Sequence, residues 1–208
     1  MKKYKNYIIL IIFTMGTQAL FYYLIKHFAH DYNVINSVIN IPLVKPFIYF
    51  YGSWYPFILL STFIVYKNDN KLFHYMIISM LLGALMSQIT FILYPSMIIR
   101  PNIEVHNITD WILNFTYISD DPPINCLPSM HCVYCFVTSF FILKCDSIKT
   151  KYKLLFAIYS FLIVISTVFV KQHVIEDVIL AFIYTLIVLF IVHLNKERIN
   201  KLFNKIKL

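Results

Sequence analysis

The chain has 208 residues, of which 60% are hydrophobic and only 13% are charged, and its formal net charge is +8 at pH 7. Soluble domains carry about 25% charged residues, so this composition excludes an ordinary soluble domain. Only three glycines accompany the many Ile, Phe, Leu and Tyr residues, which excludes a flexible or disordered chain. We therefore expect one integral membrane domain over residues 1–208, in contact with the lipid bilayer and with no nucleic-acid partner.

Six apolar segments predict membrane-spanning helices, each of which needs about 20 mostly apolar residues. In chain order they cover about 7–27, 46–66, 72–94, 128–143, 154–170 and 174–194. The fourth and fifth segments are short, so we expect those helices to be tilted or extended. The first is too long for a signal peptide and lacks a small-residue cleavage site. The sequence thus predicts an all-α bundle of six transmembrane helices.

The Lys and Arg residues predict how these helices cross the membrane. Six spans place both termini on one side, which carries Lys2, Lys3 and Lys5, the lysines within 67–71 and 144–153, and a basic tail that ends with Lys207. Of the 18 Lys and Arg residues, only four fall on the other side: Lys26, Lys45, Arg100 and Lys171. Because basic residues concentrate in cytoplasmic loops, both termini are predicted to be cytoplasmic in a multi-pass cell-membrane protein.

Three polar clusters interrupt the apolar pattern at the predicted extracytoplasmic ends of the helices. They are YPSMIIRPN at 94–102, NCLPSMHC at 125–132 and STVFVKQHVIED at 166–177. The loops at about 30–45 and 95–127 face the same side. Ionisable groups near membrane depth are energetically unfavourable and usually functional. Clusters at one level of a bundle can meet, so we expect one site on the extracytoplasmic face.

The second cluster predicts an anion-binding helix start. Pro128 fits the first turn of a helix, where its missing N–H costs nothing. The free N–H groups of such a helix end bind phosphate readily, and the Ser129 hydroxyl adds a donor. His131 lies in the same turn and can exchange a proton near neutral pH.

The other two clusters complete a phosphoryl-transfer chemistry. His173 and Asp177 are four residues apart and would share a helix face, where the carboxylate can orient the imidazole as a nucleophile. Arg100 can bind a phosphate in bidentate fashion and Lys171 can add a point charge. An anion pocket with two imidazoles indicates phosphoryl transfer through a histidine.

These residues resemble the type 2 phosphatidic acid phosphatase superfamily, whose signature is KxxxxxxRP, then PSGH, then SRxxxxxHxxxD. Arg100-Pro101 matches the first motif, PSMH at 128–131 the second and STVFVKQHVIED the third. The motif-bearing part covers about 94–194, and the family's six helices and outward-facing site agree with the expected topology.

The resemblance implies a role for each matching residue. His173 would form a phospho-histidine intermediate, Asp177 would orient it, and His131 would protonate the leaving oxygen and then activate the acceptor. Arg100, Ser129 and the backbone near Met130 would hold the phosphate oxygens. The family needs no metal, so we expect no metal and no cofactor.

Three positions depart from the signature: Leu93 stands at the first-motif Lys, Thr167 at the third-motif Arg, and Met130 at the glycine of PSGH. We expect Lys171, one helical turn after Thr167, to compensate for the lost cations, and Gln172 to donate to the phosphate. Similar departures occur in the branch of inositol phosphorylceramide and sphingomyelin synthases, which transfer a phospho-head group between lipids.

Three hypotheses about the function therefore remain open. The first is hydrolysis of a membrane lipid substrate of the phosphatidate, phosphatidylglycerol phosphate or undecaprenyl diphosphate type. The second is head-group transfer to a lipid acceptor. A third is a non-enzymatic bundle that binds haem through His131 and His173. Asp120 and Asp121 could gate a substrate, although a capped turn is the simpler interpretation, and the CxxC pair Cys132 and Cys135 is expected to pack as small apolar side chains.

Overall fold

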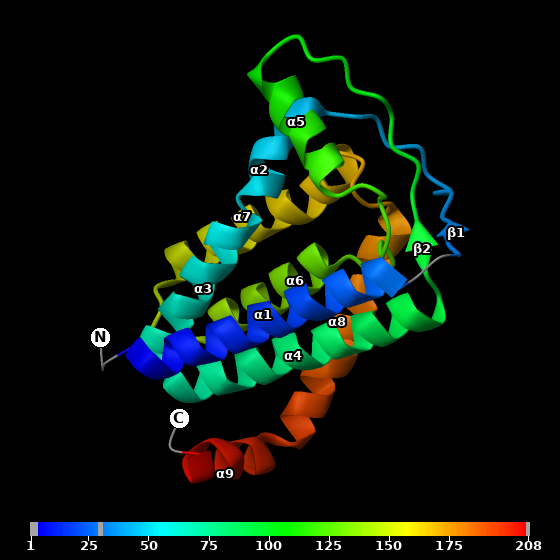
Figure 1. Ribbon diagram of the computed structural model, residues 1–208. Helices are drawn as coiled ribbons and strands as arrows, with labels where there is room; N and C mark the ends of the chain where they lie inside the picture. Colours follow the sequence, from blue (N-terminus) through cyan, green and yellow to red (C-terminus); the bar gives the residue numbers. More distant parts are fainter. Residues whose placement is uncertain (1–3, 29–30, 207–208) are drawn as a thin grey trace.

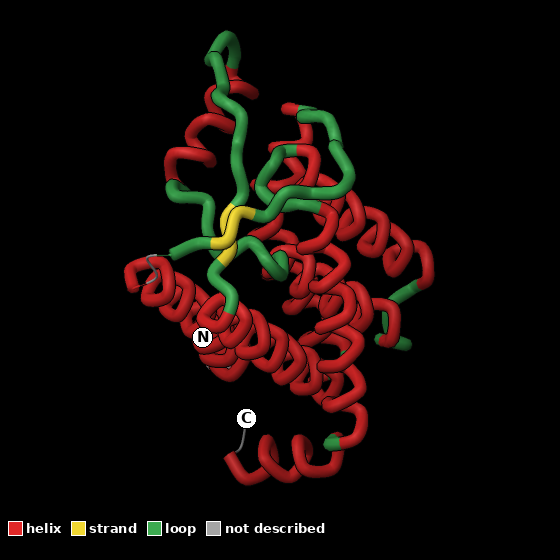
Figure 2. The backbone as a smooth tube through the Cα atoms, turned by 90° about the vertical axis from the view of Figure 1, so that its right-hand side faces the viewer, coloured by secondary structure: helices red, strands yellow, loops and turns green. Residues whose placement is uncertain are grey.

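The computed structural model describes residues 4–28 and 31–206, so Lys2, Lys3, Lys207 and the start of the predicted loop at residue 30 lie outside the described residues. The described chain is a helical bundle with one short strand pair (Figures 1 and 2). Its long helices are α1 Lys5–Phe28, α3 Trp54–Asn68, α4 Asn70–Leu93, α6 Met130–Lys144, α7 Thr150–Phe169 and α8 Ile175–Leu194. The shorter ones are η2 Lys45–Phe47, α2 Ile48–Gly52, α5 Ile108–Ser119 and α9 Lys196–Ile206.

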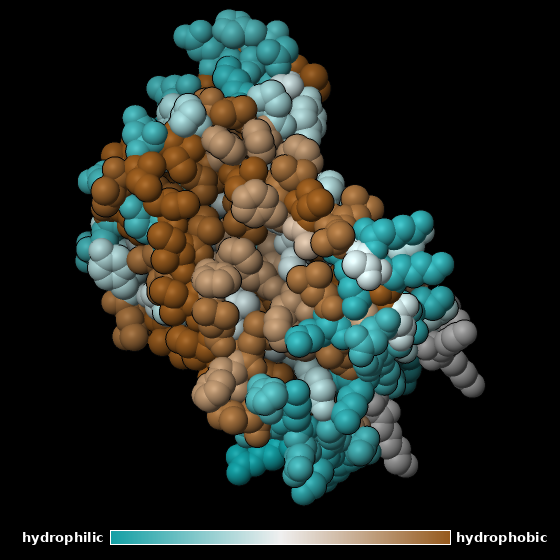
Figure 3. Space-filling view, turned by 180° about the vertical axis from the view of Figure 1, so that it is seen from behind, coloured by the Kyte–Doolittle hydropathy of each residue, from teal (hydrophilic) through white to brown (hydrophobic). Residues whose placement is uncertain are grey.

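All six predicted apolar segments are helical, and the described residues belong to an all-α membrane protein. Five helical segments are long and apolar enough to cross a membrane: α1, η2 to α3 taken together, α4, α7 and α8. The sixth, α6, is a shorter apolar helix of 15 residues. Figure 3 shows a broad hydrophobic surface between two hydrophilic ends, as expected for a protein that lipid surrounds.

The short helix α6 forms the centre of the bundle, where α3, α4, α7 and α8 pack around it. Most of its side chains are buried, including the fully enclosed Tyr134 and Val133. The helices α4 and α6 approach each other closely at Gly83, where an added Cβ atom would lie 2.7 Å from a methyl carbon of Val133. Gly83 therefore sets how closely these two helices pack.

The second apolar segment is a broken helix, with α2 ending at Gly52 and α3 starting at Trp54. Pro56 explains the break, since a proline inside a helix removes one hydrogen bond and its ring clashes with the carbonyl four residues earlier. Tyr51 and Trp54 lie on either side of the break, and both line the candidate site described below.

The two loops at the far end of the bundle contain more structure than predicted. A parallel strand pair, β1 Asn33–Val34 with β2 Ser96–Met97, joins them. The segment 95–127, expected as a loop, also contains α5, which the side chain of Asn107 caps by accepting a hydrogen bond from the Asp110 N–H at 3.0 Å. These elements gather at one end of the bundle (Figures 1 and 2).

Buried polar contacts attach α5 to the bundle. Asp110 forms an ion pair of 2.7 Å with Lys45, and that lysine, acting by hydrogen bond, holds the pKa of Asp110 below its usual range. The Tyr117 hydroxyl donates to the Val170 carbonyl at 2.8 Å. At the opposite end, α9 returns beneath α4, where the Phe203 ring stacks on His74 at 3.9 Å (Figure 1).

Replacing Gly83 with alanine is expected to destabilise the bundle by about 1–3 kcal/mol, because the added methyl group overlaps Val133 in a packed core. Thermal unfolding in detergent would measure the change. Gly16→Ala is the matched control: a Cβ there meets nothing within 4 Å, so that variant should unfold at or above the wild-type temperature. Adding Val133→Ala to Gly83→Ala should recover part of the lost unfolding temperature, because it removes the overlapping methyl groups. A double variant no more stable than Gly83→Ala would contradict the assigned contact.

Candidate active site

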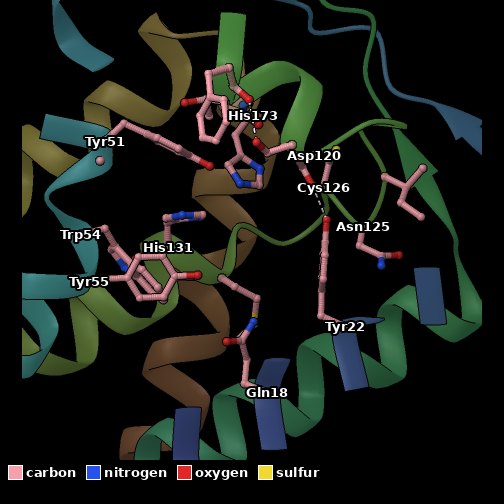
Figure 4. A pocket seen from close by; sticks show the side chains of 17 residues that line it. Gln18, Tyr22, Tyr51, Trp54, Tyr55, Asp120, Asn125, Cys126, His131 and His173 are labelled. Atoms are coloured by element: carbon pink, nitrogen blue, oxygen red, sulfur yellow. Dashed lines mark hydrogen bonds between the residues drawn. The ribbon is translucent and has the colours of Figure 1, made fainter. Parts of the chain in front are cut away.

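Two of the three polar clusters, 125–132 and 166–177, line one cavity at the loop-covered end of the bundle, and the third cluster contacts the residues of its wall through Arg100. The cavity has a volume of about 380 Å³. His131 and His173 line it, together with the aromatic side chains of Tyr22, Tyr51 and Trp54 and the carboxylate of Asp120 (Figure 4). We call this space the histidine cavity.

The turn between α7 and α8 positions His173. Two N–H groups, those of Gln172 and His173, both donate to the Thr167 carbonyl at 3.0 Å, and the Lys171 N–H donates to the Val168 carbonyl. This pattern is a Schellman motif, with Lys171 at φ 53° in the left-handed position that glycine usually occupies. The chain thus leaves the helix at Val170, close to the predicted end, so Lys171 does not continue the helical face of Thr167.

The His173 side chain is oriented by Asp177. Its Nδ1 lies 2.9 Å from Asp177 Oδ2, which also accepts the Val174 N–H at 3.1 Å. The contact between these two side chains is the predicted one, but His173 lies before the start of α8, and its ring contacts Asp177 in the first turn of that helix. Because the carboxylate is an acceptor, Nδ1 carries the hydrogen and Nε2 is left for a substrate.

The second cluster starts α6, two residues after the predicted start at about Pro128. Pro128 precedes the helix and Ser129 is its N-cap, with the hydroxyl accepting the Cys132 N–H at 3.4 Å. Ser129 is fully buried, and its own N–H donates to the Asp177 carbonyl at 3.3 Å. Met130 and His131, the first residues of α6, line the histidine cavity, where the first N–H groups of a helix lack helical partners.

The ring of His131 is held between two aromatic side chains. Its centroid lies 4.7 Å from that of Tyr51 and 4.6 Å from that of Trp54. The indole N–H of Trp54 also donates to the His131 carbonyl at 3.2 Å. The ring of His173 is 5.9 Å away, so one phosphate-sized group can contact both imidazoles.

Arg100 lies behind the cavity wall and is 7% exposed. Its Nη2 donates to Asp120 Oδ2 and to Gln172 Oε1, both at 2.5 Å. Its Nη1 donates to the carbonyls of Tyr117 and Asp120. Arg100 therefore joins the end of α5 to the residue before His173, and its terminal nitrogens are engaged with protein groups.

The positions that depart from the signature bring no cation into the cavity. Leu93 ends α4 with 77% of its surface exposed, and the buried Thr167 hydroxyl donates to the Val164 carbonyl. The Lys171 ammonium donates to the Ile41 carbonyl. Lys171 lines a separate cavity of about 210 Å³ on the other side of His173, formed with the segment 35–40.

Sequence reasoning did not find the residues that surround the motif positions. Tyr51 and Trp54 carry a detectable signal, since they flank the helix break before Pro56. Lys26 of α1 lies 3.5 Å from Asp120 Oδ1, and the Tyr22 hydroxyl donates to the same oxygen at 2.6 Å. These contacts join residues about a hundred positions apart, and no sequence pattern indicates them.

The cysteines pack as apolar side chains. Cys132 and Cys135 are fully buried in the main core cluster. Cys126 lines the histidine cavity, and burial raises the pKa of its thiol, which therefore stays protonated near neutral pH. Over residues 4–28 and 31–206, no group of three or more His, Cys, Asp or Glu side chains has the arrangement of a metal site.

The comparisons with known proteins agree with this geometry. The model of the PAP2 superfamily matches residues 72–201, which is more than half of the chain and includes both histidines, Asp177 and Arg100. Neither the curated proteins nor the solved structures gave a match. On the family match, the chain belongs to the PAP2 superfamily, whose members are phosphatases or phosphotransferases.

Proposed function

We propose that the protein is an integral membrane lipid phosphatase, which hydrolyses a lipid phosphate or diphosphate through a phospho-histidine intermediate. One observation carries the proposal: the carboxylate-oriented His173 faces His131 across a cavity at one end of an apolar helical bundle. Substrates of the phosphatidate, phosphatidylglycerol phosphate or undecaprenyl diphosphate type fit this chemistry.

The proposed reaction has two steps. In the first, Nε2 of His173 attacks phosphorus, the bond between phosphorus and the leaving oxygen breaks, and His131 gives that oxygen a proton. In the second, His131 takes a proton from water, whose oxygen attacks phosphorus as the nitrogen–phosphorus bond breaks. Asp177 accepts the Nδ1 hydrogen of His173 throughout and stabilises the charge that develops on the ring.

The start of α6 is proposed to stabilise the phosphate oxygens. The N–H groups of Met130 and His131 lie at the positive end of the helix dipole, next to the cavity. Arg100 and Gln172 are linked to each other beside His173 and are proposed to complete the anion site. The Ser129 hydroxyl contributes by accepting the Cys132 N–H, which fixes where α6 starts.

The position of the cavity supports a lipid as substrate. It opens at the end of a hydrophobic surface, and exposed aromatic rings, those of Tyr55 and Phe115, line it. We propose six spans with both termini in the cytoplasm, since α9 and the first turns of α1 lie at the opposite end from the cavity (Figure 1). The site then faces the extracytoplasmic side of the cell membrane.

Head-group transfer between lipids is the second candidate. The observation that favours it is the absence of a cation at two signature positions, Leu93 and Thr167. A doubly charged phosphate monoester needs more positive charge than a singly charged diester does. The two reactions differ only in the second step, where a lipid hydroxyl replaces water.

Replacing His173 with alanine is expected to abolish phosphate release from a panel of lipid phosphates and diphosphates, because the nucleophile is lost. The assay would use detergent-purified protein with excess chelator. His106→Ala is the matched control: this histidine also lies in the loop region but is 71% exposed, so its loss should leave turnover unchanged. Equal release by wild type and His173→Ala would rule out the assigned nucleophile.

If neither protein releases phosphate, a labelled phospholipid donor with a lipid alcohol acceptor would test the second candidate. Transfer by wild type and not by His173→Ala would establish head-group transfer at the same site.

Asp177→Asn is expected to lower kcat by about a hundredfold or more, because a neutral amide no longer stabilises the positive charge that develops on the His173 ring. Asn keeps an oxygen that can accept the Val174 N–H, so the unfolding temperature should change much less than kcat does. The neighbouring Glu176→Gln serves as control, since Glu176 accepts the Val38 N–H at 2.9 Å and does not touch either histidine. A kcat for Asp177→Asn near the wild-type value would contradict the orienting role.

A further inference from the structure

Asp120 is held between two cations at the wall of the histidine cavity. Its Oδ2 accepts from Arg100 Nη2 at 2.5 Å, and its Oδ1 lies 3.5 Å from Lys26 Nζ. The Tyr22 hydroxyl donates to Oδ1 at 2.6 Å. This carboxylate therefore receives from the protein the set of charges and donors that a bound phosphate would require.

The charges around Asp120 leave room for a stronger anion. Lys26 and Arg100 bring two positive charges against one carboxylate, and their side chains are only 21% and 7% exposed. Ion pairs at such positions are screened less than pairs on the open surface. A phosphate group carries more negative charge and offers more acceptor oxygens than a carboxylate, so it can compete for both cations.

Lys26 and Arg100 do not line the histidine cavity themselves, but both contact Asp120, which does. Asp120 lines the cavity together with His131 and His173 (Figure 4). The Arg100 nitrogen that binds Asp120 is also 2.5 Å from Gln172 Oε1, and Gln172 directly precedes His173. A phosphate that replaced the Asp120 carboxylate would thus lie between the two cations and next to the nucleophile.

We propose that Lys26 supplies the second phosphate-binding cation of this site, and that Asp120 is a resident anion which the substrate phosphate displaces. The inference rests on the proposed function and names a residue outside the signature motifs. Lys26 comes from the last turn of α1, outside the segment that the family model matches. It takes the part that the sequence analysis gave to Lys171, whose ammonium donates instead to the Ile41 carbonyl.

Asp120 stabilises the site when no substrate is bound. A guanidinium as buried as that of Arg100 is costly without a counter-charge, and the carboxylate supplies it when no substrate is bound. Displacement by phosphate keeps Arg100 paired throughout and releases Asp120 toward solvent, where it is already 31% exposed. The Arg100 contacts to the carbonyls of Tyr117 and Asp120 can stay in place, so the displacement requires only the Asp120 side chain to move.

The test measures binding of inorganic phosphate to the detergent-purified full chain by ³¹P NMR line broadening, which needs no turnover. Lys26→Met is expected to weaken binding by about tenfold, the effect of one lost charge-assisted contact. Asp120→Asn is expected to tighten binding by about tenfold, since the competing charge is gone. Lys26→Arg, which keeps the charge, should bind nearly as well as wild type.

Lys45→Met is the matched control. It removes a lysine of the same outer region that is also paired with an aspartate, but this aspartate, Asp110, does not line the histidine cavity as Asp120 does. Phosphate binding should be unchanged. Circular dichroism and a monodisperse elution profile would exclude misfolding of each variant.

The outcomes separate this inference from the proposed function. If wild type binds phosphate and Lys26→Met binds it equally well, Lys26 is not a phosphate ligand, while the proposed anion site stands. Lys171→Gly tests the alternative cation, since the left-handed backbone at this position suits glycine. If phosphate binding falls about tenfold in that variant instead, Lys171 is the second cation. Unchanged or weaker binding by Asp120→Asn overturns the displacement, and no binding by folded wild type overturns both the inference and the proposed anion site.

Discussion

The buried Asp177 joins the chain segments that form the site. Its carboxylate accepts from the His173 ring and the Val174 N–H, and its carbonyl accepts from the N–H of Ser129. Where lipid surrounds a bundle, water is not available for such groups, so each must find a partner inside the protein. These bonds set the start of α6 against the start of α8, and thereby the separation of His131 from His173.

The sequence predicted what depends on hydropathy and on local motifs. Apolar segments of the required length became helices, and the spacing of His173 and Asp177 produced the expected contact. The position of Ser129 at a helix start was also visible, since serine is a preferred N-cap. Each of these features depends on a few neighbouring residues, or on the requirement that a segment in lipid forms its backbone hydrogen bonds internally.

The parts that could not be predicted depend on contacts between distant segments or on unusual backbone. Lys171 adopts a left-handed conformation without the glycine that usually signals it, so the local sequence did not indicate that its side chain leaves the helical face of Thr167. Asn107 signalled the start of α5, but a helix of 12 residues in a polar loop is weak in hydropathy. The pairing of Lys26 and Arg100 on Asp120 follows only from the folded arrangement of α1, α5 and the segment after β2.

If the substrate phosphate displaces Asp120 as proposed, the balance of charges in the site also determines which ligand it selects. With Leu93 and Thr167 in place of two signature cations, Arg100 is the only basic residue left at the signature positions, and Asp120 neutralises it. A ligand that removes Asp120 must therefore be at least as anionic as a carboxylate, which a lipid phosphate is and a neutral lipid is not. Recognition then depends on charge at one point of the cavity, while aromatic walls such as those of Tyr51 and Trp54 accept apolar groups of varied shape. A site of this kind would distinguish lipids by their phosphate more sharply than by the rest of the molecule.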